Sequence, residues 1–239
     1  MGVIKKVSST GLIIDYILDR IQRGELKPGD QLMNERAFSE ELGVSRMPLR
    51  EAISALSMMG ILDAQQGSGT YIKSYDPNAL GRIMSIYSVL DDISIDDLFE
   101  VRAIMESQAV RLSVERATEE DIARMEESVR EGYAYLERVQ KDGESAEMPA
   151  EKFTRLNSFH NAVTAGSHNR YLLQFMDSIR AMSSEYVSRS RRDPLSEFST
   201  ALEQHKAILE AVRARDADTA SRLLYEHLMH EADSLKRSM

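Results

Sequence analysis

The order of hydrophobic patterns in the first 75 residues constrains the fold more than any other feature. Three segments with the apolar spacing of helices precede two short runs suited to strands. The first segment begins near Ser9 and is broken by the Leu-Lys-Pro-Gly run at 26–29. Asn34 and Ser45 stand as N-cap residues before the second and third segments, and Gly43 ends the second. We therefore expect three short helices at the start of the chain.

The pattern changes after Gly60, where residues 61–65 and 70–73 form β-compatible runs around a glycine-rich turn at 66–69. Two such runs predict a β-hairpin. Three helices followed by a hairpin are the order of a winged helix-turn-helix, whose last helix enters the major groove of DNA. The sequence thus predicts a DNA-binding domain over residues 1–75, followed by a hinge at Asp76-Pro77.

The remainder, residues 76–239, has helical spacing throughout. Ser94 with Asp97 and Thr118 with Asp121 have capping-box spacing. Apolar residues follow the first box at helical intervals, at Leu98, Val101, Met105 and Leu112. Other helices are expected over 78–90, 150–165, 169–191, 195–215 and 218–236, with a polar loop at 142–149. The predicted fold class is mostly α, with an N-terminal winged helix-turn-helix followed by an all-α antiparallel helical bundle.

Charge and composition limit the binding partners and the cellular compartment that we expect. The net charge of −9 argues against binding a polyanion with the whole surface, but residues 1–76 hold nine basic and ten acidic side chains, so most of the surplus acid lies downstream. The absence of cysteine excludes disulfides and thiolate metal sites. Because no apolar segment suits a signal peptide or a membrane span, we expect a cytoplasmic protein without a membrane partner.

Three arginines are candidates for reading DNA. Arg46 and Arg50 lie one turn apart on the third expected helix, outside its apolar face, and Arg36 lies at the start of the second. A guanidinium group suits the guanine edge or a phosphate. Paired arginines at this spacing are more often solvated surface residues, so the prediction depends on the order of the helices around them.

All five histidines lie in the second part, and His160, His205 and His227 fall on three different expected helices. A helical bundle can gather imidazoles from separate helices around a divalent cation. No H-x-x-x-H or H-E-x-x-H motif anchors such a site, and a single histidine on a helix is more often structural. Spacing alone therefore leaves a metal site and a structural role both open.

The first part resembles the DNA-binding domain of GntR-family regulators. The resemblance is carried, in order and spacing, by LKPGDQL from Leu26, NERA from Asn34, LGVSRMPLREA from Leu42 and GSGTYI from Gly67. It covers nearly all of residues 9–73. The residues that it implies for DNA contact are Arg36, Ser45, Arg46, Met47, Arg50 and Gly67, the last at the tip of the wing.

The second part looks like the FCD ligand domain of the FadR-type subfamily. The segments that carry this resemblance are LFEVRAIME from Leu98, ERAT from Glu115, FHNAV from Phe159, EQHKAILEAVRARD from Glu203 and EHL from Glu226, together with Asn169. In that subfamily three histidines and one Asp or Asn hold a metal, to which a carboxylate effector often binds. The resemblance implies that His160, His205 and His227 are the histidine ligands, and that Arg102 faces the effector.

The chain departs from this pattern at the fourth ligand. The acidic residue should stand four positions before the first histidine, where this chain has Leu156. Asn157 lies on nearly the same helical face and is the remaining candidate for an oxygen ligand.

We therefore expect a transcription regulator that acts as a repressor, and we do not expect an enzyme. It would bind a short palindromic operator in double-stranded DNA as a homodimer, under the control of a small carboxylate effector such as a hydroxy acid or a sugar acid. A divalent metal ion, Zn, Ni or similar, is the expected cofactor. Two alternatives remain: a metal-dependent hydrolase that uses the three-histidine site, and an architectural DNA-binding protein without a ligand. Metal-dependent ester turnover would favour the first, and effector-independent DNA affinity with a metal-free bundle the second.

Overall fold

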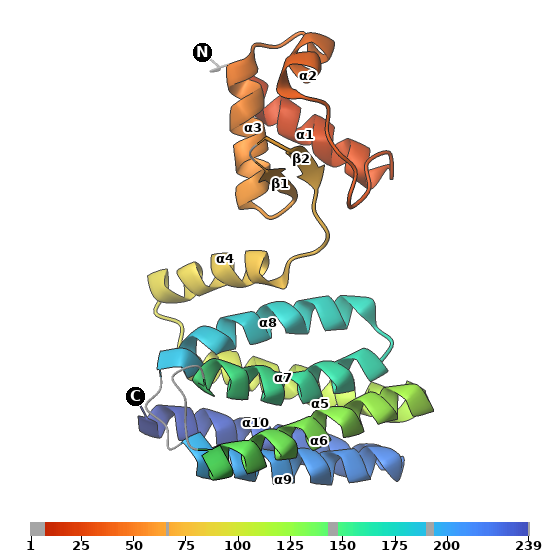
Figure 1. Cartoon of the computed structure of the whole chain (residues 1–239), viewed down its shortest axis with the longest axis vertical. Helices are drawn as coiled ribbons and strands as arrows, with labels where there is room; N and C mark the ends of the chain where they lie inside the picture. The colour runs from red at the N-terminus through yellow and green to blue at the C-terminus, as the bar shows by residue number, and fades with distance from the viewer. Residues whose placement is uncertain (1–7, 66, 143–147, 190–193, 239) are drawn as a thin grey trace, which may run out of the picture. The chain divides into compact units, whose positions relative to one another are not determined.

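A computed structural model describes residues 8–65, 67–142, 148–189 and 194–238. The chain divides into two compact units, residues 1–80 and 81–239. The elements of the first unit are α1 (Ser9–Gln22), α2 (Glu35–Leu42), α3 (Arg46–Met58), β1 (Leu62–Gln65), β2 (Gly69–Ile72) and the start of α4 (Pro77–Leu90) (Figure 1). The first unit is thus three helices and an antiparallel hairpin, the order that the sequence predicts.

The core of the first unit forms where one face of each helix meets the hairpin. Its buried members include Ile13 and Ile17 of α1, Phe38 of α2, Leu49, Ile53 and Leu56 of α3, and Leu62 and Ile72 of the strands. In α1 and α3 these residues recur at intervals of three or four, so they lie on one face of each helix. Burying one such side chain contributes about 1.5–3 kcal/mol, so this face fixes how α3 is held and which side of it stays outside.

Turn chemistry fixes the ends of these elements. The Asn34 side chain accepts a hydrogen bond from the backbone N–H of Ala37 at 2.9 Å, and Gly43 ends α2 in the left-handed conformation, with φ +63°. Ser45 occupies the N-cap position of α3, but its hydroxyl makes no capping hydrogen bond, in contrast to the expected cap.

The hairpin pairs Leu62 with Ile72 at one end and Gln65 with Gly69 at the other. Gly69 has φ +120°, and a side chain there would collide with that of Gln31. The Gln31 amide instead donates to the Ser68 carbonyl oxygen at 3.0 Å, which ties the turn to the preceding loop. Gln66, which the sequence places in this turn, lies outside the described residues.

The second unit is helical in its described part. Besides the rest of α4 it contains α5 (Ile95–Arg116), α6 (Glu119–Asp142), α7 (Met148–Gly166), α8 (Arg170–Arg189), α9 (Pro194–Arg213) and α10 (Ala217–Ser238). Figure 1 shows α5 to α10 lying roughly side by side. Both predicted capping boxes form, at Ser94 with Asp97 and at Thr118 with Asp121. Residues 143–147 of the expected loop and 190–191 of an expected helix lie outside the described residues.

Helix α5 is the central element of the second unit, because it packs against α7, α8, α9 and α10. Its buried face combines Phe99 and Ala103 with the charged side chains of Arg102 and Glu106. The apolar residues whose spacing predicts this helix do not form its buried face. Val101 is 44% exposed, and Leu98, Met105 and Leu112 are half-buried. Among the described residues, no helix combines the length and apolar character needed to cross a membrane.

Candidate DNA interface and metal centre

Helix α3 presents its two arginines to solvent. The side chains of Arg46 and Arg50 are 59% and 64% exposed, and Glu35 in the first turn of α2 lies 3.7 Å from Arg46 and 2.6 Å from Arg50, measured to its Oε2. Arg36 is 81% exposed and pairs with Glu40 at 3.1 Å. Exposed ion pairs of this kind are weak, so a phosphate or a base edge can replace the carboxylate at small cost.

The other residues expected at DNA lie on the same unit. Ser45 is exposed at the N-terminus of α3, where free backbone N–H groups and the positive end of the helix dipole favour a phosphate. Met47 is 70% exposed, and an apolar side chain there suits the methyl group of thymine. Gly67 lies in the hairpin turn with φ +80°. All six residues are thus on the outside of the first unit or in its turn.

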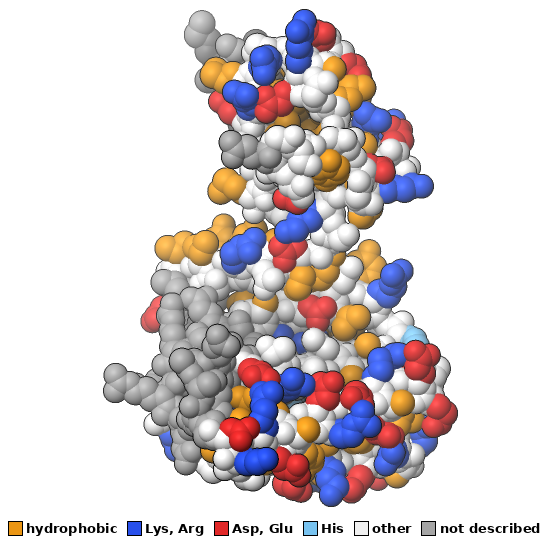
Figure 2. Space-filling model, viewed as in Figure 1, with side chains coloured by type: hydrophobic (Ala, Val, Ile, Leu, Met, Phe, Trp, Pro, Cys, Tyr) orange, Lys and Arg blue, Asp and Glu red, His pale blue; other side chains and the backbone are white. Residues whose placement is uncertain are grey.

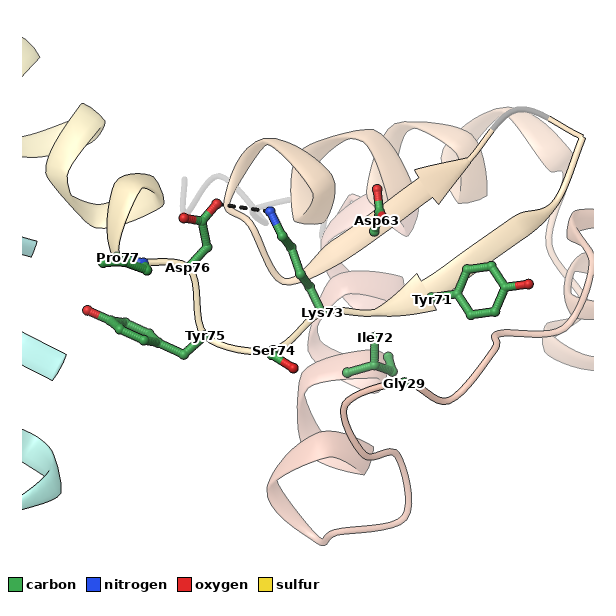
Figure 3. A pocket seen from close by; sticks show the side chains of 9 residues that line it. All are labelled: Gly29, Asp63, Tyr71, Ile72, Lys73, Ser74, Tyr75, Asp76 and Pro77. Carbon is green, nitrogen blue, oxygen red and sulfur yellow. Dashed lines mark hydrogen bonds and ion pairs between the residues drawn. The ribbon is translucent and has the colours of Figure 1, made fainter. Parts of the chain in front are cut away.

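A shallow pocket of about 480 Å³ lies between the hairpin and the start of α4. Figure 3 shows the Lys73 side chain reaching the Asp76 carboxylate, at 2.9 Å, at the edge of this pocket. The hydrogen bond from Lys73 lowers the pKa of Asp76, which also accepts from the backbone N–H of Asn78 at 3.0 Å. These contacts fix the connection from β2 into α4, and we assign them a structural role.

The second unit brings three histidines from three helices together. His160 of α7, His205 of α9 and His227 of α10 are 2%, 1% and 4% exposed. Their Nε2 atoms face one another at 3.2–3.3 Å. Three nitrogen ligands at about 2.0–2.1 Å from a tetrahedral zinc ion would be about 3.3 Å apart, so the spacing fits a divalent cation.

Hydrogen bonds on the far side of two rings fix the proton positions. The Nδ1 of His160 lies 2.6 Å from the Glu106 carboxylate, and the Nδ1 of His227 lies 2.7 Å from the Gln204 carbonyl oxygen. Both partners only accept, so each Nδ1 donates, and each Nε2 is left to offer its lone pair to a cation. Two lone pairs that face each other at 3.2 Å repel unless a cation lies between them.

The surroundings of two of the histidines favour the neutral form of the ring. Burial, together with the neighbouring histidines, lowers the pKa of His205 and His227 well below the ordinary value, so both are neutral at pH 7. The ring of His205 stacks on that of Phe159, with centroids 4.3 Å apart. Neutral imidazoles held by packing are the form that binds metal ions.

Two buried arginines surround Glu106. Arg102 donates from Nε to Glu106 Oε1 at 2.9 Å, and Arg180 Nη1 lies 3.6 Å from the same oxygen. Burial alone would raise the pKa of Glu106, but His160, Arg102 and Arg180 hold it well below its usual range. Burial alone would lower the pKa of Arg102, but the carboxylates of Glu106 and Glu231 outweigh this effect, so the pKa is raised. This network keeps Glu106 ionised and positions His160.

The position of the expected fourth ligand is apolar. Leu156 packs in part against the buried cluster of Tyr135, Leu136, Val139, Phe198 and Leu202. Asn157 is half-buried on α7, three residues before His160. The other two histidines are exposed, and His168 pairs with Asp121 at 2.9 Å.

Sequence reasoning missed Glu106, Arg180 and Gln204. Glu106 stands four residues after Arg102, a spacing that ordinarily indicates an exposed ion pair on a helix. Gln204 adjoins His205 and could have been examined as its neighbour. For Arg180 the sequence offers no signal, because its burial depends on how α8 packs against α5 and α7.

Comparison with known families agrees with the folds of both units. Residues 10–72 match the family model "Bacterial regulatory proteins, gntR family", and residues 97–230 match the FCD domain. A winged helix-turn-helix and a separate helical ligand domain together define a DNA-binding transcription regulator. The chain belongs to the GntR family, in the group whose second domain is an FCD domain.

Individual relatives extend over most of the chain. The transcriptional regulator LutR of Bacillus subtilis is 31% identical over 219 residues, which cover 90% of this chain and 95% of LutR. A putative L-lactate dehydrogenase operon regulatory protein of Escherichia coli is 28% identical, over 94% of this chain and 85% of that protein. Among solved structures, the GntR protein of Streptococcus agalactiae has a TM-score of 0.66 at 25% identity and covers 94% of this chain and 99% of its own.

Proposed function

We propose that this chain is a repressor that binds a short palindromic operator as a homodimer and responds to a small carboxylate effector. The observation that carries the proposal is the pair of exposed guanidinium groups on α3, from Arg46 and Arg50, beside the N-terminus of that helix. Arg36, Ser45, Met47 and Gly67 complete the DNA-contacting set, and a C2 dimer would present it to two half-sites.

The histidine centre supports a metal-assisted effector site. His160, His205 and His227 would hold a divalent ion, Zn, Ni or similar, with Asn157 as the candidate fourth ligand. The ion would supply a Lewis-acidic position for one carboxylate oxygen, while Arg102 neutralises the charge of the same group. A hydroxy acid or a sugar acid fits this chemistry, and the name of the E. coli relative, which refers to an L-lactate dehydrogenase operon, supports the former.

Regulation requires only that the effector prefer one of two states of the dimer. A coupling of about 1–3 kcal/mol between effector and operator changes the operator affinity about five- to 150-fold. The relatives are named as transcription regulators, which supports this role over that of a metal-dependent hydrolase.

The DNA contacts are tested by fluorescence anisotropy on a DNA site that the wild-type chain selects from a random library. Arg46→Ala with Arg50→Ala is expected to abolish sequence-specific binding, because each bidentate base contact contributes about 1–3 kcal/mol of discrimination. Arg23→Ala, which removes an exposed arginine of the same unit paired with Asp19, serves as the control and should retain specific binding. Specific affinity in the double variant would remove α3 from the interface.

A further inference from the structure

Two arginines near the histidine centre are buried as deeply as core residues. Arg102 on α5 is 1% exposed and Arg180 on α8 is 3% exposed. Both approach one oxygen of Glu106, at 2.9 Å and 3.6 Å. Glu106 is thus a buried carboxylate that the two guanidinium groups share, while Glu231 beside Arg102 and Asp177 beside Arg180 remain partly exposed, at 14% and 27%.

Neither arginine is fully hydrogen-bonded. Arg102 Nη1 and Arg180 Nε are buried and have no hydrogen-bond partner. Glu231 lies 3.5 Å from Arg102 Nη1 as a longer ion pair, and its side chain remains 14% exposed. Buried guanidinium N–H groups are normally paired, so the two unpaired donors indicate that further acceptors belong here.

Arg180 is held in place by contacts that leave its Nε unpaired. Its Nη2 donates to Asp177 at 3.0 Å, and its Nη1 donates to the Thr164 hydroxyl at 3.3 Å. Thr164 in turn donates to the His160 carbonyl oxygen at 2.8 Å, one turn earlier on α7. The guanidinium group is thus oriented before a ligand arrives, which lowers the entropy cost of binding an anion.

We propose that Arg180 is a second anchor of the effector site, and that the effector is an acid with two carboxylates. Arg102 binds the carboxylate nearer the histidines, and Arg180 binds the other. Because the two guanidinium groups approach the same Glu106 oxygen, the carboxylates they bind belong to a short diacid, of about four carbons, rather than a long one. This inference rests on the proposed carboxylate effector and adds its chemical class.

The test compares two acids that share a 2-hydroxycarboxylate end and differ in a second carboxylate, L-malate and L-lactate. Isothermal titration uses the full-length chain dialysed against Zn²⁺. Wild type is expected to bind malate about tenfold more tightly or better, since a charge-assisted contact to a second carboxylate is worth at least that factor. Arg180→Gln should lower malate affinity to that of lactate and leave lactate unchanged, whereas Arg102→Gln should weaken both.

Arg213→Gln, at an exposed ion pair with Glu126, is the matched control and should bind both acids as wild type does. Equal wild-type affinity for the two acids, or an equal loss of both in a folded Arg180→Gln chain, would overturn the diacid assignment alone. Failure of folded wild type to bind either acid would overturn the proposed carboxylate effector as well. If circular dichroism shows that Arg180→Gln does not fold, the diacid assignment is decided by two measurements: the malate and lactate affinities of Arg180→Lys, and those of wild type.

Discussion

Glu106 is the residue on which the histidine centre depends. Its side chain is 1% exposed. One carboxylate oxygen accepts a hydrogen bond from His160 Nδ1, and the other accepts one from Arg102. Glu106→Gln is expected to weaken zinc binding about 10- to 100-fold, because an outer partner of a ligating histidine fixes its tautomer and basicity. A competition titration with a chromophoric chelator measures this affinity.

The same substitution is expected to lower the free energy of unfolding by about 3–5 kcal/mol, since it leaves two buried cations without their central anion. Glu226→Gln, at an exposed pair with Arg222, should change the free energy of unfolding by less than about 0.5 kcal/mol. Wild-type zinc affinity in a folded Glu106→Gln chain would show that Glu106 does not position His160.

Asp121 gives the second unit a defined sensitivity to acid. Burial would raise the pKa of its carboxyl group, but hydrogen bonds from Thr118 and His168 lower it from 3.8 to about 2. The unfolded chain therefore takes up a proton before the folded one, so stability is present above the ordinary pKa and is lost as the pH falls toward 2.

Between about pH 5 and about pH 3 this group should remove about 1 kcal/mol of stability. Urea unfolding of wild type and Asp121→Asn at both pH values isolates that contribution, because the amide does not titrate. If wild type and Asp121→Asn lose the same free energy of unfolding between these pH values, Asp121 is not the group responsible.

Sequence reasoning correctly predicted exposure where it follows from position on a helix. Arg46 and Arg50 were predictable as exposed because the apolar residues of α3 fix which face is buried. The histidines were predictable only through the family resemblance, since they lie 45 and 22 residues apart in the chain. Glu106 and Arg180 were not, because the burial of a charge depends on partners from other helices.

At the scale of elements, α5 and α4 leave apolar side chains in solvent. Val101 and Ile104 of α5 are 44% and 51% exposed. Figure 2 shows hydrophobic side chains gathered over α4. The exposed apolar residues of α4 in the second unit are Ile83, Met84, Ile86, Tyr87 and Leu90. Monomeric proteins rarely expose apolar patches of this kind, and we expect a second copy of the chain to cover the face of α5.

Ile104→Glu is therefore expected to convert a dimer into a monomer, because it places a charge beside Val101 on the exposed apolar side of α5. Sedimentation velocity measures the change, and Glu115→Gln, at an exposed position near the end of the same helix, is the control. A wild-type chain that sediments as a monomer, or a dimer that Ile104→Glu leaves intact, would exclude α5 as the interface.

The order of elements was predictable because each helix has its own start and end signals. The capping boxes at Ser94 and Thr118 fixed the beginnings of α5 and α6. The buried face of α5 was not predictable in the same way, because its apolar stripe and its buried face are different sides of the helix. The stripe at Leu98, Val101, Met105 and Leu112 gives the correct helical period without identifying the buried side.

At the scale of the whole molecule, the proposed regulation couples DNA binding by the first unit to acid binding by the second. An effector shifts the operator equilibrium only by its difference in affinity for two states of the dimer. Binding of the acid and binding of DNA must then affect each other by the same factor.

The most direct test measures the affinity of the full-length chain for its selected DNA site by anisotropy, with and without the organic acid that most raises its melting temperature. The acid should change DNA affinity about fivefold or more, and His205→Ala should retain DNA binding but lose that response. An acid that binds wild type without changing its affinity for DNA would contradict the account.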